Sequence, residues 1–190
     1  MQIEFEATFT GIDKSAVRAK LHEVGGTLVK KESLMRRTVF NPPIAIPGGW
    51  MRVRDEGDTI TMSLKVVNGS AIEDQKEVMV TVDDFDNAVD FLSAIGAEKK
   101  AYQETLREAW MLNGAEVTID TWPGLRPFVE VEAHDEATVR TASELLGFNY
   151  ADAKFCEVST VYLEELGIPQ DIMKNHMPLI TFEHPPTQYV

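Results

Sequence analysis

Ile3-Glu4-Phe5-Glu6-Ala7-Thr8-Phe9, near the N-terminus of this 190-residue chain, alternates apolar and polar residues without a break. In a β-strand, one face of this stretch would carry Ile3, Phe5, Ala7 and Phe9. Glu4 and Glu6 would then stand on the other face, about 7 Å apart. Neighbouring carboxylates repel each other unless cations lie nearby. Those cations are either Lys and Arg side chains in water or a divalent metal, and this strand alone favours the first.

The composition is typical of a soluble globular protein, with 44% hydrophobic and 26% charged residues. The net charge of -13 argues against a nucleic-acid partner, although a small anion could still bind in a local basic cavity. Cys156 is the only cysteine, so no intrachain disulfide can form, and we expect a cytoplasmic protein. The N-terminus does not resemble a signal peptide and no apolar run is long enough to span a bilayer, which predicts that there is no membrane partner.

The order of hydrophobic patterns predicts a β-α-β-β-β unit that occurs twice. In the first unit the helix begins after an N-cap at Asp13 and ends at Gly25-Gly26, and the strands cover residues 3–9, 34–40, 50–55 and 59–67. In the second unit Asp83 or Asp84 caps the helix, Gly96 ends it, and the strands cover residues 76–82, 104–112, 115–121 and 128–133. Eight mainly antiparallel strands are enough to close a barrel and remove its sheet edges.

The remainder of the chain is predicted to be helical. Helices are expected over residues 136–146 and 155–166, followed by a short turn over 168–174 and an irregular tail over 178–190 that could lie across the domain. Because no flexible linker is recognisable, we expect one domain over residues 1–190, with a core over 2–166 and a helical turn and tail over 167–190. The predicted fold is α+β, an eight-stranded antiparallel barrel with helices packed outside it.

Several strands carry an apolar face and a charged face. The polar faces carry Arg52 and Arg54, then Thr61, Ser63 and Lys65, then Glu116, Thr118 and Asp120, and finally Glu130 and Glu132. In an ordinary barrel such charges meet water, whereas in an inverted barrel they line a tunnel and the apolar faces pack beneath the helices. The pattern alone does not choose between these arrangements. In the inverted barrel, an ion or a ligand would complete the charge balance.

The side chains of such a tunnel suit phosphate chemistry. Arg and Lys bind phosphate oxygens, and clustered carboxylates bind Mg²⁺ or Mn²⁺, which can bridge to phosphate. These are the parts that phosphoryl transfer requires. The sequence contains no glycine-rich phosphate loop and no spacing typical of a nucleophilic triad or a zinc site. The scattered histidines are expected at the surface: His22, His134, His176 and His184.

A set of short motifs follows in a recognisable order. They are E-x-E at Glu4 and Glu6, R-x-R at Arg52 and Arg54, S-L-K at Lys65, K-E at Lys76-Glu77, T-x-D at Asp120 and F-V-E-V-E at Glu130 and Glu132. The ordered set covers residues 2–166 and resembles the CYTH superfamily of triphosphate tunnel metalloenzymes, which includes class IV adenylate cyclases and thiamine triphosphatases. Residues 120–125, leading into the last motif, resemble the cyclase-like branch.

The resemblance implies a tunnel that binds a triphosphate-bearing substrate together with Mg²⁺ or Mn²⁺. It implies phosphate contacts from Arg52, Arg54, Lys65, Arg107 and Lys154. It implies metal ligation by Glu4, Glu6, Asp120, Glu130 and Glu132. Glu77 would orient a cation or a metal-bound water, so Glu77 and Lys154 are the candidate catalytic residues.

Two positions depart from the family pattern. Thr8 stands where the first motif has a lysine, and Thr105 replaces a lysine common two residues before Arg107. Each missing cation removes a charge-assisted phosphate contact of about 1.5–3 kcal/mol. We hypothesise that Arg37, rather than Arg36, restores one charge, because it has the strand parity of Val39. A structure with both guanidinium groups outside the lumen would contradict this.

The expected function is metal-dependent hydrolysis of a small triphosphate, namely ATP, inorganic triphosphate or thiamine triphosphate. The first alternative is cyclisation of ATP to cyclic AMP and pyrophosphate, which also needs an adenine pocket and an aligned ribose hydroxyl. Trp50 or Trp122 could stack on a base, although packing is their simpler role. The second alternative, raised by Thr8 and Thr105, is a non-catalytic module that binds nucleotide or polyphosphate. The substrate, the metal and the oligomeric state, a homodimer included, stay open.

Overall fold

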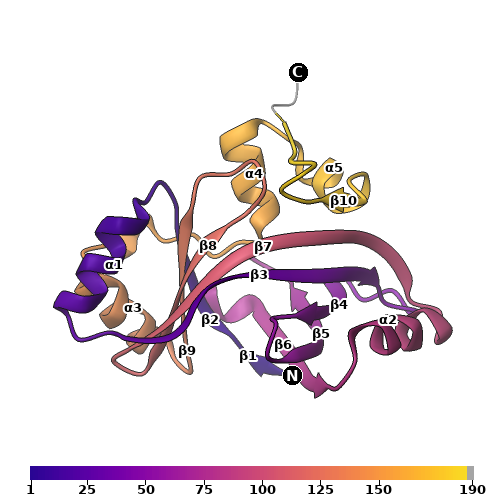
Figure 1. Ribbon diagram of the computed structural model, residues 1–190, viewed down its shortest axis with the longest axis horizontal. Helices are drawn as coiled ribbons and strands as arrows, with labels where there is room; N and C mark the ends of the chain where they lie inside the picture. The colour runs from indigo at the N-terminus through magenta and orange to yellow at the C-terminus, as the bar shows by residue number, and fades with distance from the viewer. Residues whose placement is uncertain (188–190) are drawn as a thin grey trace.

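An antiparallel sheet forms the centre of the structure, a computed structural model that describes residues 1–187 (Figure 1). The first half of the chain contains β1 (Gln2–Ile3), β2 (Phe5–Phe9), α1 (Lys14–Glu23), β3 (Thr27–Asn41), β4 (Gly49–Asp55) and β5 (Ile60–Val67). The second half contains β6 (Gln75–Val82), α2 (Phe85–Ala94), β7 (Glu98–Leu112), β8 (Ala115–Thr121) and β9 (Phe128–Ala133). The predicted repeat of β-α-β-β-β is therefore confirmed.

The first strand closes the sheet. The strands follow the order β6-β5-β4-β3-β7-β8-β9-β2, and each neighbouring pair is antiparallel. β1 and β2 are separated only by Glu4, yet β1 pairs with β6 and β2 pairs with β9, the two ends of this order. The Glu4 backbone N–H donates to the Gln75 carbonyl at 3.0 Å. Counted as one bent strand, β1 and β2 complete the predicted eight-stranded barrel within residues 1–187, and it is nearly closed.

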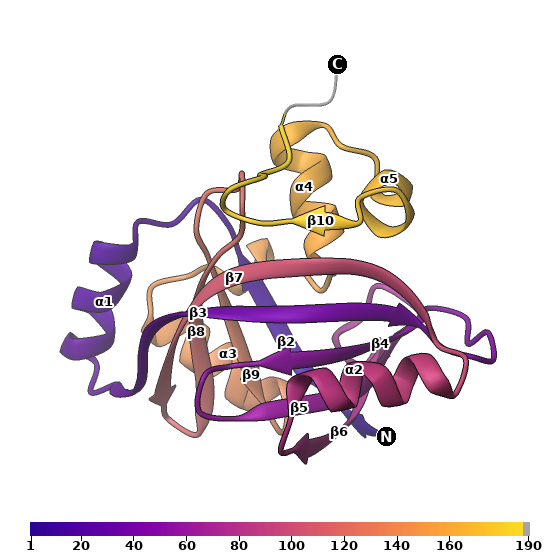
Figure 2. The ribbon, with the colours of Figure 1, turned by 45° about the vertical axis from the view of Figure 1, so that its right-hand side comes forward.

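Helices cover the outer face of this barrel. On one side, α1 and α3 (Glu136–Leu145) pack on β2, β8 and β9, whose outward side chains Val117, Ile119, Val129 and Val131 are fully buried. On another side, Val89 and Leu92 of α2 pack with Phe40 and Val53. Figure 2 shows α1 and α2 at different ends of the barrel. The apolar faces therefore point outward, and the inverted arrangement is the correct one.

Aspartates begin the three long helices. The side chains of Asp13, Asp84 and Asp135 accept hydrogen bonds from backbone N–H groups of the first turn, at Ala16, Asn87 and Thr138. Such caps satisfy amide groups that have no partner within the helix. The predicted cap at Asp13 is confirmed, and of the two candidates for the second helix the cap is Asp84.

The C-terminal part lies over the barrel, next to β7 (Figure 2). It contains α4 (Val158–Leu166), α5 (Gln170–Asn175) and β10 (Leu179–Ile180), while short 3-10 turns cover Ile72–Asp74 and Tyr150–Asp152. β10 pairs with β7 in parallel, and the Tyr102 N–H donates to the Pro178 carbonyl at 2.9 Å. The tail was expected to be irregular, but residues 179 and 180 extend the sheet. Residues 188–190 of that tail lie outside the described residues.

Two expectations about the strands were wrong. β3 and β7 each have 15 residues, whereas the sequence pattern predicted only residues 34–40 and 104–112. Residues 27–33 are largely exposed and contain Lys and Glu, so they lack the alternation that marks a half-buried strand, and residues 98–103 begin with the polar run Glu98-Lys99-Lys100, which also lacks it. Ile3 is 45% exposed rather than buried, because the bend at Glu4 takes it away from the apolar cluster under α1 and α3. No helix of residues 1–187 is long and apolar enough to cross a bilayer.

Candidate functional site

The barrel encloses a cavity of about 820 Å³, a volume typical of small-molecule sites. The cavity is lined by most of the predicted site residues, namely Glu4, Glu6, Arg37, Arg52, Arg54, Lys65, Glu77, Arg107, Glu130 and Glu132. Strand pairing brings them together, because Arg37 lies opposite Arg54 and Lys65 lies opposite Glu77. Asp120 and Lys154 are not among the lining residues.

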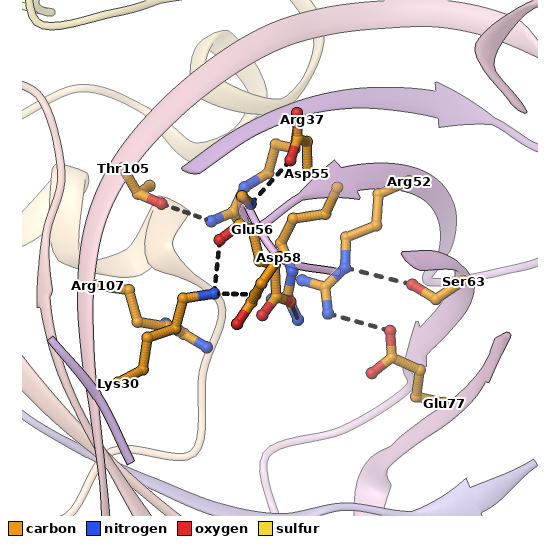
Figure 3. A network of polar contacts seen from close by, with 12 residues as sticks. Lys30, Arg37, Arg52, Asp55, Glu56, Asp58, Ser63, Glu77, Thr105 and Arg107 are labelled. Atoms are coloured by element: carbon orange, nitrogen blue, oxygen red, sulfur yellow. Dashed lines mark hydrogen bonds and ion pairs between the residues drawn. The ribbon is translucent and has the colours of Figure 1, made fainter. Parts of the chain in front are cut away.

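Arginines from three strands converge in the cavity. Figure 3 shows Arg37 of β3, Arg52 of β4 and Arg107 of β7 directed toward one region. Burial lowers the pKa of Arg37, and the charges of Arg52, Arg54 and Arg107 lower it further. Burial and the charges of Arg52 and Arg107 likewise lower the pKa of Arg54 to about 10. Arg52, Arg54 and Arg107 each have a carboxylate partner, Arg54 with Glu56 at 2.5 Å, so within residues 1–187 the charge left for a bound anion is that of Arg37.

Arg37 lies beside Thr105, the residue that stands where the family pattern has a lysine. Its Nη2 donates to Thr105 Oγ1 at 2.9 Å, and no carboxylate of residues 1–187 forms an ion pair with it. The Nε atom is buried and has no hydrogen-bond partner in the described chain. The guanidinium lies over the Trp122 ring, 4.7 Å from its centroid. Arg37 thus points into the lumen, as hypothesised, and Trp122 serves as a packing surface for it.

Arg107 is the best-compensated arginine. Its Nε and Nη2 donate to Asp120 Oδ1 and Oδ2 at 2.7 and 2.6 Å, and Nη2 also donates to Glu130 Oε2 at 2.6 Å. Burial opposes ionisation of Asp120, but the charge and hydrogen bonds of Arg107 hold the pKa of this carboxyl below its usual value. Burial raises the pKa of Glu130 well above its usual value, and so do the charges of Glu6 and Asp120. One arginine thus holds two carboxylates and cannot fully compensate both.

Further carboxylates gather around the first strand. Lys65 Nζ lies 2.9 Å from Glu4 Oε2 and 3.6 Å from Glu6 Oε2, and Glu6 pairs directly with Glu132 across β2 and β9. Burial, together with the hydrogen bond to Glu77, raises the pKa of Glu4 to about 8. Burial and the Glu6 charge raise the pKa of Glu132 to about 7. Around these carboxyl groups, negative charge therefore exceeds the positive charge that Lys65 supplies.

Glu77 remains ionised within this group. Burial would raise its pKa, but the hydrogen bond with Glu4 and the charge of Arg52 lower it to about 2. Arg52 Nη2 donates to Glu77 Oε1 at 3.1 Å, and Arg52 Nε donates to Ser63 Oγ at 3.2 Å (Figure 3). Glu77 and Ser63 consequently fix the orientation of the Arg52 guanidinium.

The carboxylates fit a divalent metal by their chemistry, because oxygen ligands are those that Mg²⁺ and Mn²⁺ prefer. The raised pKa values of Glu4, Glu130 and Glu132 are what buried carboxyl groups show when a neutralising cation is lacking. Within residues 1–187, however, no three acidic, histidine or cysteine side chains are grouped as ligands of one ion. Arg107 and Lys65 engage several of these carboxylates instead.

Lys154 is oriented differently from the other predicted cations. Its ammonium group forms an ion pair with Glu164 of α4. Its backbone pairs with Thr8, because each N–H donates to the other residue's carbonyl, at 2.9 and 3.0 Å. The residue thus lies beside the first motif, while its side chain contacts a helix.

The cavity also contains charged residues that the sequence analysis did not select, including Lys100, Lys174, Glu157 and Glu116. Glu116 has the same strand parity as Asp120, so parity was a usable signal for it. Lys100 and Lys174 belong to no motif. Their positions depend on a strand irregularity and on the C-terminal helices, which strand parity does not predict.

Comparison with protein families identifies the class of this barrel. The model of the CYTH domain matches residues 3–159. The chain therefore belongs to the CYTH family, as the ordered motifs suggested. A search of curated proteins found no match.

Solved structures share the fold. A conserved hypothetical protein from Pyrococcus furiosus has a TM-score of 0.68 at 20% identity, over 85% of this chain and 98% of that chain. A candidate adenylate cyclase from Vibrio parahaemolyticus has a TM-score of 0.72 at 13% identity, over 84% and 97%. A candidate adenylyl cyclase from Hippeastrum, for which a dominant triphosphatase activity is stated, has a TM-score of 0.56 at 14% identity, over 90% and 99%. At these identities the likeness concerns the fold.

Proposed function

We propose that this protein is a divalent-metal-dependent hydrolase that acts on a triphosphate bound in the barrel. One observation carries the proposal: Arg37, Arg52, Arg54 and Arg107 line one cavity, and Arg37 has no carboxylate partner in residues 1–187. Burying like charges together is unfavourable unless an anion binds there. A triphosphate carries several negative charges on closely spaced oxygens, which guanidinium groups bind in a bidentate way.

In the proposed complex, Arg37, Arg52, Arg54, Lys65 and Arg107 contact phosphate oxygens. Glu77 keeps Arg52 aligned, and its low pKa means that it remains ionised across the neutral range. Lys154 remains a candidate for phosphate contact and catalysis, although its ammonium group would first have to leave Glu164.

Mg²⁺ or Mn²⁺ would be held by Glu4, Glu6, Glu130 and Glu132. Asp120, which does not line the cavity and accepts two hydrogen bonds from Arg107, remains a candidate ligand. When bound, the metal would neutralise phosphate charge and increase the electrophilicity of phosphorus. The arginines of the chain would position the phosphates within the cavity. The preferred metal is left for experiment.

Hydrolysis is placed ahead of cyclisation because cyclisation requires a base-binding site. Both tryptophans considered for stacking line the cavity, but Trp122 already has Arg37 over its ring, which leaves Trp50 as the candidate for stacking on a base. The stated triphosphatase activity of the Hippeastrum protein indicates that this fold is compatible with hydrolysis. A single domain over residues 1–190, a cytoplasmic location, the lack of nucleic-acid and membrane partners, and a homodimer remain predictions or open alternatives.

Product analysis distinguishes the three functions. The protein is incubated with ATP, inorganic triphosphate or thiamine triphosphate, each with Mg²⁺ and with Mn²⁺. We expect release of phosphate that requires the metal. Formation of cyclic AMP and pyrophosphate would instead identify a cyclase, and tight binding without turnover would identify a binding module.

A substitution at Glu130 tests the metal ligands. Glu130→Gln is expected to raise the metal concentration needed for half-maximal activity by about 10-fold or more, as for other changes around a metal site. Stability should change by less than about 1 kcal/mol, because the pKa of Glu130 is raised and a neutral side chain of equal size replaces it. Metal titrations of activity and urea unfolding measure the two effects. Glu144→Gln, on the exposed face of α3, is the control, and equal metal titrations for both variants would contradict the assignment.

A further inference from the structure

A β-bulge places one lysine at the cavity. In the pairing of β3 with β7, Val39 lies opposite Ala101 but the next residue, Phe40, lies opposite Lys99. Lys100 is therefore an extra, unpaired residue of β7. Bulges of this kind change the direction of a side chain and are common at barrel rims. Lys100 consequently lines the cavity, while the neighbouring Lys99 is exposed and does not.

The bulge lies close to the arginine cluster. Ala101, the neighbour of Lys100, pairs with Val39, and Val39 pairs with Arg52 on the other side. Lys100 is thus two strands away from Arg52 around the wall. Neighbouring strands lie about 4.8 Å apart, so the two backbones are about 10 Å apart, a span that the long side chains of Arg52 and Lys100 shorten.

The C-terminal segment adds to the same region. Lys174 and Asn175 of α5 line the cavity with Lys100, and Lys174 Nζ lies 3.0 Å from Glu157 Oε2. The family model ends at residue 159, so α5 lies outside the part that the chain shares with that model. Lys100 and Glu157 lie inside the matched residues, so only α5 adds to the wall from outside them.

The charges of this section favour an anion. Lys174 is paired with Glu157, but within residues 1–187 no carboxylate lies at ion-pair distance from Lys100. Burial lowers the pKa of Lys100, the neighbouring charge of Lys174 lowers it further, and Glu157 opposes the shift. One positive charge is left over at the rim of a site that already holds several arginines. A cationic group, such as the ring of thiamine, would be repelled there.

We propose that Lys100 and Lys174 bind a phosphate group beyond the three held by the arginine cluster, so that the protein prefers linear phosphate chains of four or more units. The inference rests on the proposed function, because it extends the same binding site. It also predicts discrimination against thiamine triphosphate, whose fourth group is cationic.

Calorimetric titration without added metal tests binding independently of turnover. The probes are inorganic triphosphate, inorganic tetraphosphate and thiamine triphosphate. We expect the wild-type protein to bind tetraphosphate about 10-fold or more tightly than triphosphate, the gain of a charge-assisted contact. Thiamine triphosphate should bind more weakly than triphosphate.

Substitutions assign the effect to the lysines. Lys100→Gln and Lys174→Gln should remove most of the preference for tetraphosphate and leave triphosphate affinity within about twofold, since each removes a single contact. Lys100→Arg should keep the preference, and Lys99→Gln is the matched control that removes the adjacent, outward charge.

Two results would overturn the inference alone: equal affinities of the wild-type protein for the two phosphate chains, or equal losses for both chains in Lys100→Gln. If triphosphate binds to the wild-type protein neither without metal nor with Mg²⁺ or Mn²⁺ added, the proposed function fails, and this inference fails with it.

Discussion

Replacing Arg107 by methionine is expected to lower the free energy of unfolding by about 3–5 kcal/mol, the usual cost of breaking a buried ion pair. Asp120 is fully buried and receives two hydrogen bonds from Arg107, at 2.7 and 2.6 Å. Without the guanidinium, this carboxylate has to stay charged without compensation or take up a proton. The loss should appear as a lower midpoint of urea unfolding, with little change in the slope.

Two further variants identify the cause of that loss. Arg126→Met breaks the pair with Glu165, but the Arg126 side chain is 71% exposed, so the change should cost about 1 kcal/mol or less. Adding Asp120→Asn to Arg107→Met should restore part of the stability, because the stranded charge is removed. If Arg107→Met were no less stable than Arg126→Met, the buried pair would not be holding the barrel together.

Arg37→Met is expected to show the opposite combination, with weaker ligand binding and no loss of stability. Arg37 is buried and has no carboxylate partner within residues 1–187, and three other arginines repel it. Removing such a charge is often neutral or stabilising, so the free energy of unfolding should stay within about 1 kcal/mol of the wild-type value or rise. Affinity for inorganic triphosphate should fall about 10- to 100-fold, since a charge-assisted contact contributes about 1.5–3 kcal/mol. Calorimetric titration and urea unfolding provide the two values.

Arg36→Met is the matched control on the same strand. Arg36 points to the other side, where it donates to Asp55 at 3.0 Å and lies over the Phe85 ring, 4.5 Å from its centroid. Its replacement should leave triphosphate affinity unchanged. A loss of affinity common to both variants would indicate a general charge effect, and a marked loss of stability in Arg37→Met would assign that arginine to the fold.

The sequence alone could predict only part of the surroundings of Arg37. Strand alternation identifies Arg52, Arg54 and Lys65 as polar-face residues, because the side-chain period of a strand is two. The same rule suggested Arg37 by its parity with Val39. Its hydrogen bond to Thr105 and its contact with Trp122 join residues that lie far apart in the chain, and no local pattern predicts such distances.

Short-range periodicity and turn chemistry were enough to predict the two β-α-β-β-β units, the two faces of each strand and the order of motifs. The tertiary structure decided which face of the sheet is the inside, because only the packing of α1, α2 and α3 on the apolar faces turns the charges inward. It also decided the exceptions. The bend at Glu4 closes the barrel, the bulge turns Lys100 inward, and the pairing with Glu164 turns Lys154 aside. Each of these three features depends on contacts between strands or helices that are far apart in the sequence. No single stretch of residues is therefore enough to predict them.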